Sequence, residues 1–401
     1  MQIATSWSTQ ANTVDAVEEA YRQLKQSFGG QPSLVLTYYS DNHDSQAILE
    51  RLETLSDNSP VQGGTSCLGL MTQQGFHSAN GCGLGLWAIH DPQGSYSVGI
   101  AALNGNPRKA AAEATEMALT GAGRPGEVPA LIWLNSAPGH EEKILLGIED
   151  VLGPNVPIAG GSTGDNTVTG RWKQIGAGEV HNDAVVVTAM YPSTDVAFAF
   201  HSGYEPTQHR GRVTRAQGRT LYEIDGRSAA EVYNEWTGGV IADALKGGNV
   251  LPITTLHPIG REVGRVSDVP YYQLSHPNSV TPDGALSLFS DIEEGEEILL
   301  MTGSKQNLVT RAGRVAESAI AAGQLKPDNV SGALLIYCAG CMLTIQDDMD
   351  KVASGVSSVL KGNPFIGVFT FGEQGCFVGG ENRHGNLMIS VVVFSNRANG
   401  R

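Results

Sequence analysis

The sequence predicts an α/β protein of pseudo-repeated strand–helix–strand–helix–strand units in two halves, with mixed, largely parallel sheets. The first observation is a repeated spacing of proline-led apolar runs. Pro32 (PSLVLTYYS) precedes Pro60 (PVQGGTSCLG) by 28 residues, and Pro129 (PALIWLNS) precedes Pro157 (PIAGGSTGDN) by the same 28 residues. Because shared spacing with shared punctuation seldom arises by chance, it indicates an internal repeat.

A looser third copy supports the same fold class. The run GALLIYCAG begins at Gly332, and NPFIGVFTFGEQG ends at Gly375. The second observation is that short apolar, β-branched runs alternate with amphipathic stretches. That alternation is typical of βαβ crossovers and parallel strand pairs, while the last strand of each unit fits an antiparallel neighbour.

Each unit is expected to open with a strand and an amphipathic helix. These openings are IATSWSTQANTVDAVEEAYRQL from Ile3, VGIAALNGNPRKAAAEATEMAL from Val98 and ILLMTGSKQNLVTRAGRVAESAI from Ile298. The middle strands follow, and the glycine pairs Gly63-Gly64 and Gly160-Gly161 are expected in turns, because glycine accepts positive φ. A last apolar strand then begins near Gly81, His181 and His384.

Residues between Met190 and Ile298 do not repeat this pattern. They are punctuated by proline and glycine, with short strands and one helix expected from Ala229 to Trp236. We therefore expect an N-terminal half at 1–214 and a C-terminal half at 215–401. The N-terminal half holds units 1–92 and 95–191, and the C-terminal half holds an insert at 215–295 and a third unit at 296–395.

Composition excludes several classes of protein. The 401 residues are 41% hydrophobic and 17% charged, which is typical of a globular chain. A formal net charge of −15 argues against nucleic-acid and anionic-lipid partners. No apolar run is long enough for a membrane span, and the start MQIATSWSTQ has no signal-peptide pattern. Five cysteines make no disulfide framework, so a cytoplasmic location is expected.

The pair Cys338 and Cys341 is the most distinctive reactive motif in the sequence. The hydrophobic pattern places it where an apolar strand ends and a helix begins. Such a position lowers a thiol pKa and fits a redox pair or a pocket wall. The other interpretations are two small buried hydrophobic residues or half of a zinc site, which lacks a second cysteine pair. With Gly372 and Glu373 after the neighbouring strand, the cysteines predict a ligand pocket in the C-terminal half. Arg383 supplies a positive group for a carboxylate.

Histidines in the non-repeated stretch are the candidate cofactor ligands. His257 comes first, because Ile253, Leu256 and Ile259 flank it and a haem ligand must project from an apolar surround. A half-buried turn histidine is the equally good interpretation. His201 and His276 are the next candidates. In contrast, His181 and His384 occupy matching repeat positions and are expected to be structural.

Ser162 is a candidate nucleophile under the alternative interpretation that the protein is an enzyme. The letters GGSTG from Gly160 match the nucleophile-elbow pattern, but they lead into a loop rather than the helix that the elbow requires. The glycine turns also lack the lysine of a phosphate-binding loop. An enzyme of unassigned class would therefore use Ser162 or the Cys338/Cys341 pair.

Several segments together resemble the FIST family of prokaryotic sensory proteins, which have FIST N and FIST C domains. They are VPIAGGSTGDN, RVTRAQGRTLYEIDGRSAAEVYNEWTG, LHPIG, LLIYCAGC, FIGVFTFGEQG and NRHGNLMISVVVF, in order over nearly the whole chain. Many members have an arginine near the position that Cys341 occupies here.

The resemblance implies a cytoplasmic module that binds a small molecule and regulates a separate histidine kinase or cyclic-di-GMP enzyme. It also points to a subset that binds haem and senses nitric oxide. In that case His257 would be the iron ligand and Arg383 would hold a propionate. A homodimer is compatible with this interpretation.

Overall fold

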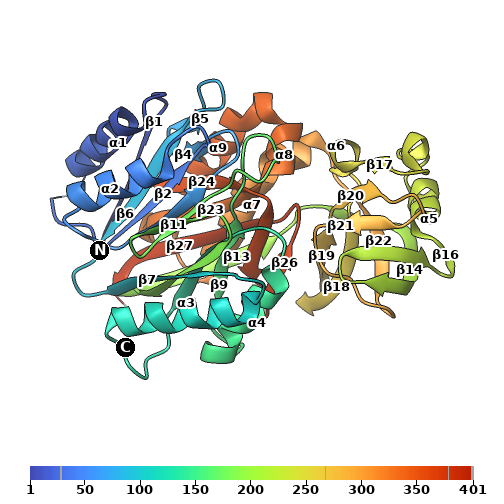
Figure 1. Cartoon of the computed structure of the whole chain (residues 1–401). Helices are drawn as coiled ribbons and strands as arrows, with labels where there is room; N and C mark the ends of the chain where they lie inside the picture. The colour runs from blue at the N-terminus through green and yellow to red at the C-terminus, as the bar shows by residue number, and fades with distance from the viewer. Residues whose placement is uncertain (28, 267, 378, 399–401) are drawn as a thin grey trace.

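The protein consists of a large core and a smaller insert that lies to one side of it (Figure 1). The computed structural model describes residues 1–27, 29–266, 268–377 and 379–398. The core comprises residues up to 201 and from 304 onward, and the insert spans residues 205–302. Both helices and mixed sheets are present, which confirms the α/β class.

The first unit has the predicted order, followed by a short hairpin. Its elements are β1 (Gln2–Ser8), α1 (Thr13–Ser27), β2 (Leu34–Tyr39), α2 (Ser45–Leu55), β3 (Val61–Thr65), β4 (Leu70–Thr72), β5 (Gly75–His77) and β6 (Leu84–His90). The carboxylate of Asp44 caps α2 by accepting the N–H groups of Gln46 and Ala47.

The second unit repeats this order element by element. Its elements are β7 (Ser95–Ala102), α3 (Pro107–Ala122), β8 (Leu131–Ser136), α4 (Glu141–Leu152), β9 (Ile158–Ser162), β10 (Gln174–Gly176), β11 (Glu179–His181) and β12 (Ala184–Tyr191). Asn106 caps α3 and Pro107 occupies its first turn, where a missing N–H costs nothing.

The third unit is discontinuous, which corrects the expectation that it lies within 296–395. Its first strand is β13 (Thr194–His201), which pairs with β27, whereas the run expected to open it forms β22 (Glu297–Thr302) and pairs with the insert strands β14 and β18. The chain therefore leaves the unit after its first strand and returns at α7. The remaining elements are α7 (Lys305–Ala322), β23 (Val330–Cys338), α8 (Ala339–Thr344), α9 (Met349–Val359), β24 (Phe365–Thr370), β25 (Gly372–Cys376), β26 (Asn382–Gly385) and β27 (Ile389–Ala398).

The three core sheets have the same strand order and exchange hairpins in a cycle. The orders are β1-β6-β2-β3-β10-β11, β7-β12-β8-β9-β25-β26 and β13-β27-β23-β24-β4-β5. The hairpin of each unit thus completes the sheet of another unit. Sequence repetition alone predicted neither this exchange nor the contacts between units that it creates.

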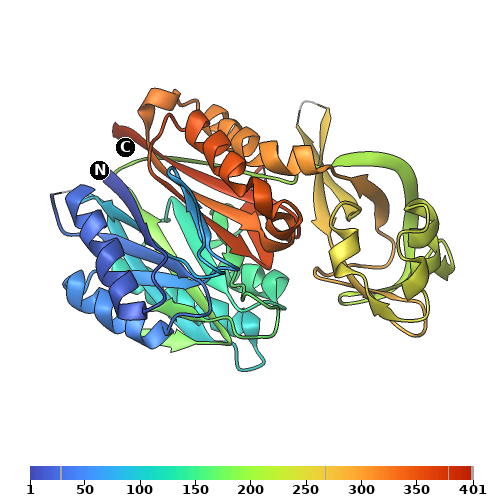
Figure 2. The same ribbon diagram turned by 90° about the horizontal axis from the view of Figure 1, so that it is seen from above.

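The core sheets are mixed rather than largely parallel. Among the described strand pairs, β2–β3, β8–β9 and β23–β24 are parallel, one in each core sheet. The last strand of each unit, β6, β12 or β27, pairs antiparallel with both neighbours, as its position suggested. Each parallel pair has a helical crossover on the outer face (Figure 2).

Four hydrophobic clusters account for the layering of the core. The inner faces of the three sheets share one cluster, which includes Trp87, Trp133 and Phe394, each fully buried. The other three clusters lie between each sheet and its own helices. Burial of apolar area on both faces explains why the central strands read as continuous apolar runs.

The glycine pairs lie within strands, which corrects the expectation of turns. Gly63-Gly64 belong to β3 and Gly160-Gly161 to β9. A Cβ on Gly63 would overlap the carbonyl oxygen of Thr37 on the neighbouring strand. A Cβ on Gly161 would lie 2.5 Å from Thr370 Cγ2, in the next unit. The glycines therefore permit close backbone approach between strands and between units.

The insert has its own sheet and its own hydrophobic cluster. The predicted boundary between residues 214 and 215 falls inside its long strand β14, which starts at Glu205. The predicted helix at Ala229–Trp236 is present as α5. The elements before β22 are β14 (Glu205–Gln217), β15 (Thr220–Ile224), β16 (Arg227–Ser228), α5 (Ala229–Trp236), β17 (Gly248–Asn249), α6 (Leu251–Thr254), β18 (Ile259–Val266), β19 (Val269–Ser275), β20 (Pro277–Val280) and β21 (Leu286–Leu288). In the part of the chain that the structure describes, no helix has the length and apolar character of a membrane span.

Candidate functional site

The insert contacts the core through Arg219, which lies in the turn between β14 and β15. Its Nη2 atom is 2.6 Å from Glu141 Oε2 and 2.7 Å from Glu142 Oε2, at the first turn of α4. Its Nε atom is 3.4 Å from Asp291 Oδ1, on the insert itself. One guanidinium therefore joins two carboxylates of the core to one of the insert.

Glu141 is buried but remains fully satisfied. Its carboxylate accepts hydrogen bonds from Ser162 Oγ at 2.6 Å and from the Gly139 N–H at 3.1 Å. Burial alone would raise the pKa of Glu141, but the nearby His384 ring and Arg219 guanidinium outweigh it and lower the pKa to about 2. The pKa of Glu142 is also lowered, against burial, by the same two neighbours. Both carboxylates are therefore ionised at neutral pH.

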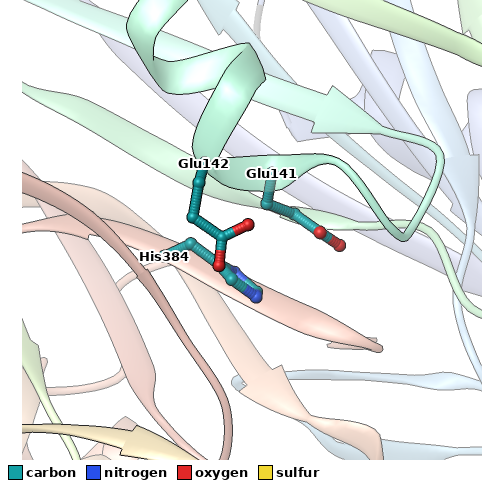
Figure 3. Close-up of side chains that lie close together, drawn as sticks. All are labelled: Glu141, Glu142 and His384. Carbon is teal, nitrogen blue, oxygen red and sulfur yellow. The ribbon is translucent and has the colours of Figure 1, made fainter. Parts of the chain in front are cut away.

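His384 approaches the same carboxylates from β26 (Figure 3). The ring is 1% exposed, with Nδ1 3.3 Å from Gln374 Nε2 and Nε2 3.2 Å from the Phe289 carbonyl oxygen. The Phe289 carbonyl can only accept, so Nε2 carries the proton in this bond and Nδ1 accepts from the Gln374 amide. His384 thus lies at the joint, which its repeat position did not indicate.

A cavity of about 700 Å³ lies next to this joint, between the insert sheet and β26. We call it the core–insert cavity. Residues of β14, β18 and β22 line it together with Arg383 from the core. Its charged lining residues are Arg210, Arg261, Arg265, Arg383, Glu262, Glu296 and Glu297.

Two of these arginines have unsatisfied hydrogen-bond donors. Arg261 is 8% exposed and binds Glu296 and Ser275 through its Nη atoms, but its buried Nε has no acceptor. Arg383 binds Gln273 and Glu381 through its Nη atoms, and its buried Nε also has no acceptor. A buried donor without a partner costs about 1–3 kcal/mol, and more when it is charged.

The predicted cysteine pair lies in the core rather than beside this cavity. Cys338 and Cys341 are reduced, buried, and part of the hydrophobic cluster under α7 and α9. The thiol of Cys341 is 3.6 Å from the hydroxyl of Tyr204. Burial opposes ionisation of this thiol, but Cys338, the Arg311 guanidinium and Tyr204 together lower its pKa to about 6. The expected position at the end of a strand and start of a helix is correct, since β23 ends at Cys338.

Arg311 of α7 is the buried cation beside these thiols. It is 1% exposed and donates through Nη1 to the carbonyl oxygens of Ser202 and Leu387, each at 2.7 Å. Its Nε and Nη2 atoms have no hydrogen-bond partner. Glu373 is buried nearby, and burial is the main cause of its strongly raised pKa. The charge of Arg311 therefore acts on both Cys341 and Glu373.

Gly372 and Glu373 lie in strand β25, not in a turn, because β25 pairs with β9 of the second unit. This pairing carries Gly372 away from the cysteines. A Cβ on Gly372 would lie 2.6 Å from His384 Cε1 and 3.2 Å from Glu141 Oε1. Of the five predicted ligand-binding residues, Gly372 and Arg383 thus adjoin the joint or its cavity, and Cys338, Cys341 and Glu373 surround Arg311.

The three candidate haem histidines do not lie together. His257 is half-buried and lines a separate groove of about 380 Å³ with His209 and Trp236. His201 ends β13 and meets Tyr271 edge to face. His276 is 3% exposed, its Nε2 has no partner, and burial lowers its pKa to about 3.

Arg219, Glu141, Glu142 and Arg261 were not singled out from the sequence. Glu141 and Glu142 could have been noted from the sequence, because carboxylates favour the first turn of a helix. That signal is equally typical of ordinary helix capping. Their meeting with Arg219 depends on how the insert docks, which residue spacing does not encode.

Comparison with known proteins supports a family assignment over most of the chain. A model of the FIST N domain matches residues 33–227, and a model of the FIST C domain matches residues 229–376. An uncharacterised protein of Methanocaldococcus jannaschii is 37% identical over 97 residues, which are 24% of this chain and 18% of that protein. The chain thus spans less than a fifth of that curated relative.

Among solved structures, cyanuric acid hydrolase from A. caulinodans aligns over 98% of this chain and 99% of its own, with 9% identity and a TM-score of 0.38. PurLQS from Thermotoga maritima aligns over 98% and 72%, with 7% identity and a TM-score of 0.23. Both scores are low, and neither likeness bears on the function of this chain.

Proposed function

The chain belongs to the FIST family, whose domains sense small ligands in signal transduction, and from that premise we propose that it binds a small oxygen anion in the core–insert cavity. One observation carries this proposal. Arg261 of the insert and Arg383 of the core both line the cavity, and each has a buried Nε donor with no acceptor. A guanidinium fork matches the geometry of carboxylate and phosphate oxygens.

The two arginines belong to different parts of the molecule, which supports a sensing role. An anion that bridges them favours one placement of the insert on the core over another. A ligand shifts a conformational equilibrium only through such a difference in affinity. The core and insert already meet at Arg219, so the bound anion would add a second link beside the first.

A panel of small carboxylates and inorganic phosphate tests the proposal by calorimetry. We expect binding to the wild-type protein and a loss of about tenfold or more in affinity for Arg261→Gln and for Arg383→Gln. Arg108→Gln is the matched control, because Arg108 of α3 forms an exposed ion pair with Asp150 of α4 and does not line the cavity. Equal affinities in all four proteins, or no binding by any anion, would contradict the proposal.

The output of the sensor is proposed to reach a separate histidine kinase or cyclic-di-GMP enzyme in the cytoplasm, and a homodimer is proposed as the form that acts. Five free, buried cysteines support a reducing compartment. Co-purification with candidate kinases, in the presence and absence of the anion, tests the partner. The size of the protein in solution, measured by light scattering, tests the dimer.

A more specific proposal is that the protein binds haem and senses nitric oxide, but the residues around His257 fit a haem site poorly. The groove beside His257 is lined mostly by polar side chains, including Thr207, Gln208 and Thr237. A haem pocket is shaped by apolar surround and a fixed axial ligand. The direct test is a Soret band after incubation with haem, and its shift in His257→Ala. Wild-type protein without a Soret band would remove haem from the proposal.

A further inference from the structure

Three potential metal ligands converge at the joint between core and insert. One ligand atom each from Glu141, Glu142 and His384 lies within 4.8 Å of the other two. Figure 3 shows Glu142 and His384 pointing toward one another, with Glu141 beside them at the start of α4. Ligand atoms around one zinc ion lie about 3–3.5 Å apart, because each bond is about 2.0–2.2 Å long. A small closing movement would therefore bring the three atoms to bonding positions.

The cation now held between the carboxylates belongs to the protein. A single atom, Nη2 of Arg219, lies 2.6 Å from Glu141 and 2.7 Å from Glu142. The guanidinium therefore occupies the position between the two carboxylates that a bound cation would take. A dication would neutralise two carboxylates more completely than one guanidinium does.

The surroundings of His384 independently suit a metal ligand. The proton on Nε2 is held by the Phe289 carbonyl oxygen, which leaves the lone pair of Nδ1 on the side of Gln374. A carbonyl acceptor on the second ring nitrogen is the usual outer support of a metal-binding histidine. Gln374 is fully buried, its amide nitrogen lies 3.3 Å from both His384 Nδ1 and Ser162 Oγ, and its Oε1 has no partner.

Gly372 packs closely against two of the three proposed ligands. A Cβ there would lie 2.6 Å from His384 Cε1, 3.1 Å from Ser162 Oγ and 3.2 Å from Glu141 Oε1. A glycine at this position in β25 therefore allows His384, Ser162 and Glu141 to lie close to the strand backbone. The fully buried Gln374, whose amide lies beside His384 and Ser162 and whose oxygen has no partner, is a separate observation that points to a ligand at the carboxylates.

We propose that Glu141, Glu142 and His384 form a site for a divalent transition-metal ion, and that the metal and Arg219 exclude each other. One nitrogen and two carboxylate oxygens make a ligand set that suits zinc or manganese. Arg219 must leave the carboxylates when the ion binds, so the turn between β14 and β15 is released from α4. The metal thus controls how firmly the insert is held on the core.

Titration of the metal-free protein with zinc or manganese chloride, followed by calorimetry, tests this site. We expect one equivalent to bind to the wild-type protein. Removing the competing guanidinium in Arg219→Gln should tighten binding by about tenfold, and removing a ligand in Glu142→Gln should weaken it by at least about tenfold. Asp150→Asn is the matched control, since Asp150 lies on the same helix α4, forms an exposed ion pair with Arg108 and is outside the ligand set.

Two results would overturn the proposal. They are unchanged affinity in Arg219→Gln, or wild-type affinity in Glu142→Gln, and either shows that the metal binds elsewhere or not at all. Gly372→Ala provides a second route, because its methyl group would lie 2.6 Å from His384 Cε1 and should displace that ring, which would weaken metal binding. The electron paramagnetic resonance spectrum of bound manganese should change in His384→Gln. Circular dichroism confirms that each variant is folded, and Arg261→Gln should keep metal binding even though it loses the anion.

Discussion

Arg219 Nη2 lies 2.6 Å from Glu141 Oε2, although the two residues are 78 positions apart and belong to the insert and the core. Glu141 is 2% exposed and Arg219 keeps only 20% of its side-chain surface. Loss of one partner from a buried ion pair leaves an uncompensated charge, which costs about 3–5 kcal/mol. The contact is therefore the main electrostatic link between insert and core.

Arg219→Ala should lower the free energy of unfolding by about 3 kcal/mol, the lower end of that range, because the guanidinium is partly exposed. Chemical denaturation measures the loss, and hydrogen exchange should show faster opening of the hairpin of β14 and β15. Arg227→Ala removes an exposed pair with Glu235 in the same insert and should leave stability unchanged. Equal losses in the two variants would contradict a special role for Arg219.

Gly63→Ala should destabilise the core by about 3 kcal/mol, because the added methyl group would overlap the backbone oxygen of Thr37 and neither strand can withdraw. Gly355→Ala is the contrasting change. Gly355 lies on the exposed face of α9 with open space around it, so alanine should stabilise the protein by about 0.5–1 kcal/mol. Thermal denaturation of the two variants checks both signs. A tolerated Gly63→Ala would show that the strands separate more easily than their packing indicates.

The sequence predicted the repeated units because each carries its own local signals. The proline-led runs from Pro32 and Pro129 became β2 and β8. The first strand of the third unit was predicted in the wrong place. Residues 298–302 and β13 are both apolar strands in the sequence, and only their pairing partners show which one belongs to the unit. Hairpin exchange was also invisible, because the choice of partner sheet is a non-local property.

In the candidate site, too, the residues with a local sequence signal could be predicted and the long-range contacts could not. Cys338 and Cys341 were visible because their chemistry is local, and the structure places them where the strand ends. The joint of Arg219 with Glu141 was not visible, because each residue looks ordinary in its own segment. Arg383 was noted for its charge, but the unpaired Nε that makes it a candidate depends on its burial in the folded protein.

Cys341 should ionise well below an ordinary thiol, because Cys338, Arg311 and Tyr204 stabilise the thiolate and lower its pKa to about 6. Thiolate absorbance in the ultraviolet, recorded from pH 4 to pH 9, should show a step that disappears in Cys341→Ser. Cys376→Ser is the control, since burial raises the pKa of that thiol to about 11. A wild-type titration without the low step would show that Glu373, not Cys341, carries the negative charge beside Arg311.

Acid should destabilise the protein through His77 and His276 before its carboxylates titrate. Burial lowers the pKa of His77 to about 4 and that of His276 to about 3, against about 6.5 in the unfolded chain. Below pH 6.5 the unfolded state therefore binds more protons than the folded state, so stability falls as pH falls toward the folded values.

At pH 5 the cost for His276 is about 2 kcal/mol, because 1.5 pH units below the unfolded pKa correspond to about 1.4 kcal/mol each. Denaturation from pH 8 to pH 4.5 should show the free energy of unfolding falling with pH. His276→Gln should reduce the slope of that fall by about the contribution of one proton, which is about 1.4 kcal/mol per pH unit. At pH 8 the histidine is neutral in both states, so any loss in His276→Gln there reports packing alone. Because the ring is buried between Phe289 and the start of α8, a slope unchanged by the substitution would mean that the ring is protonated in the folded protein.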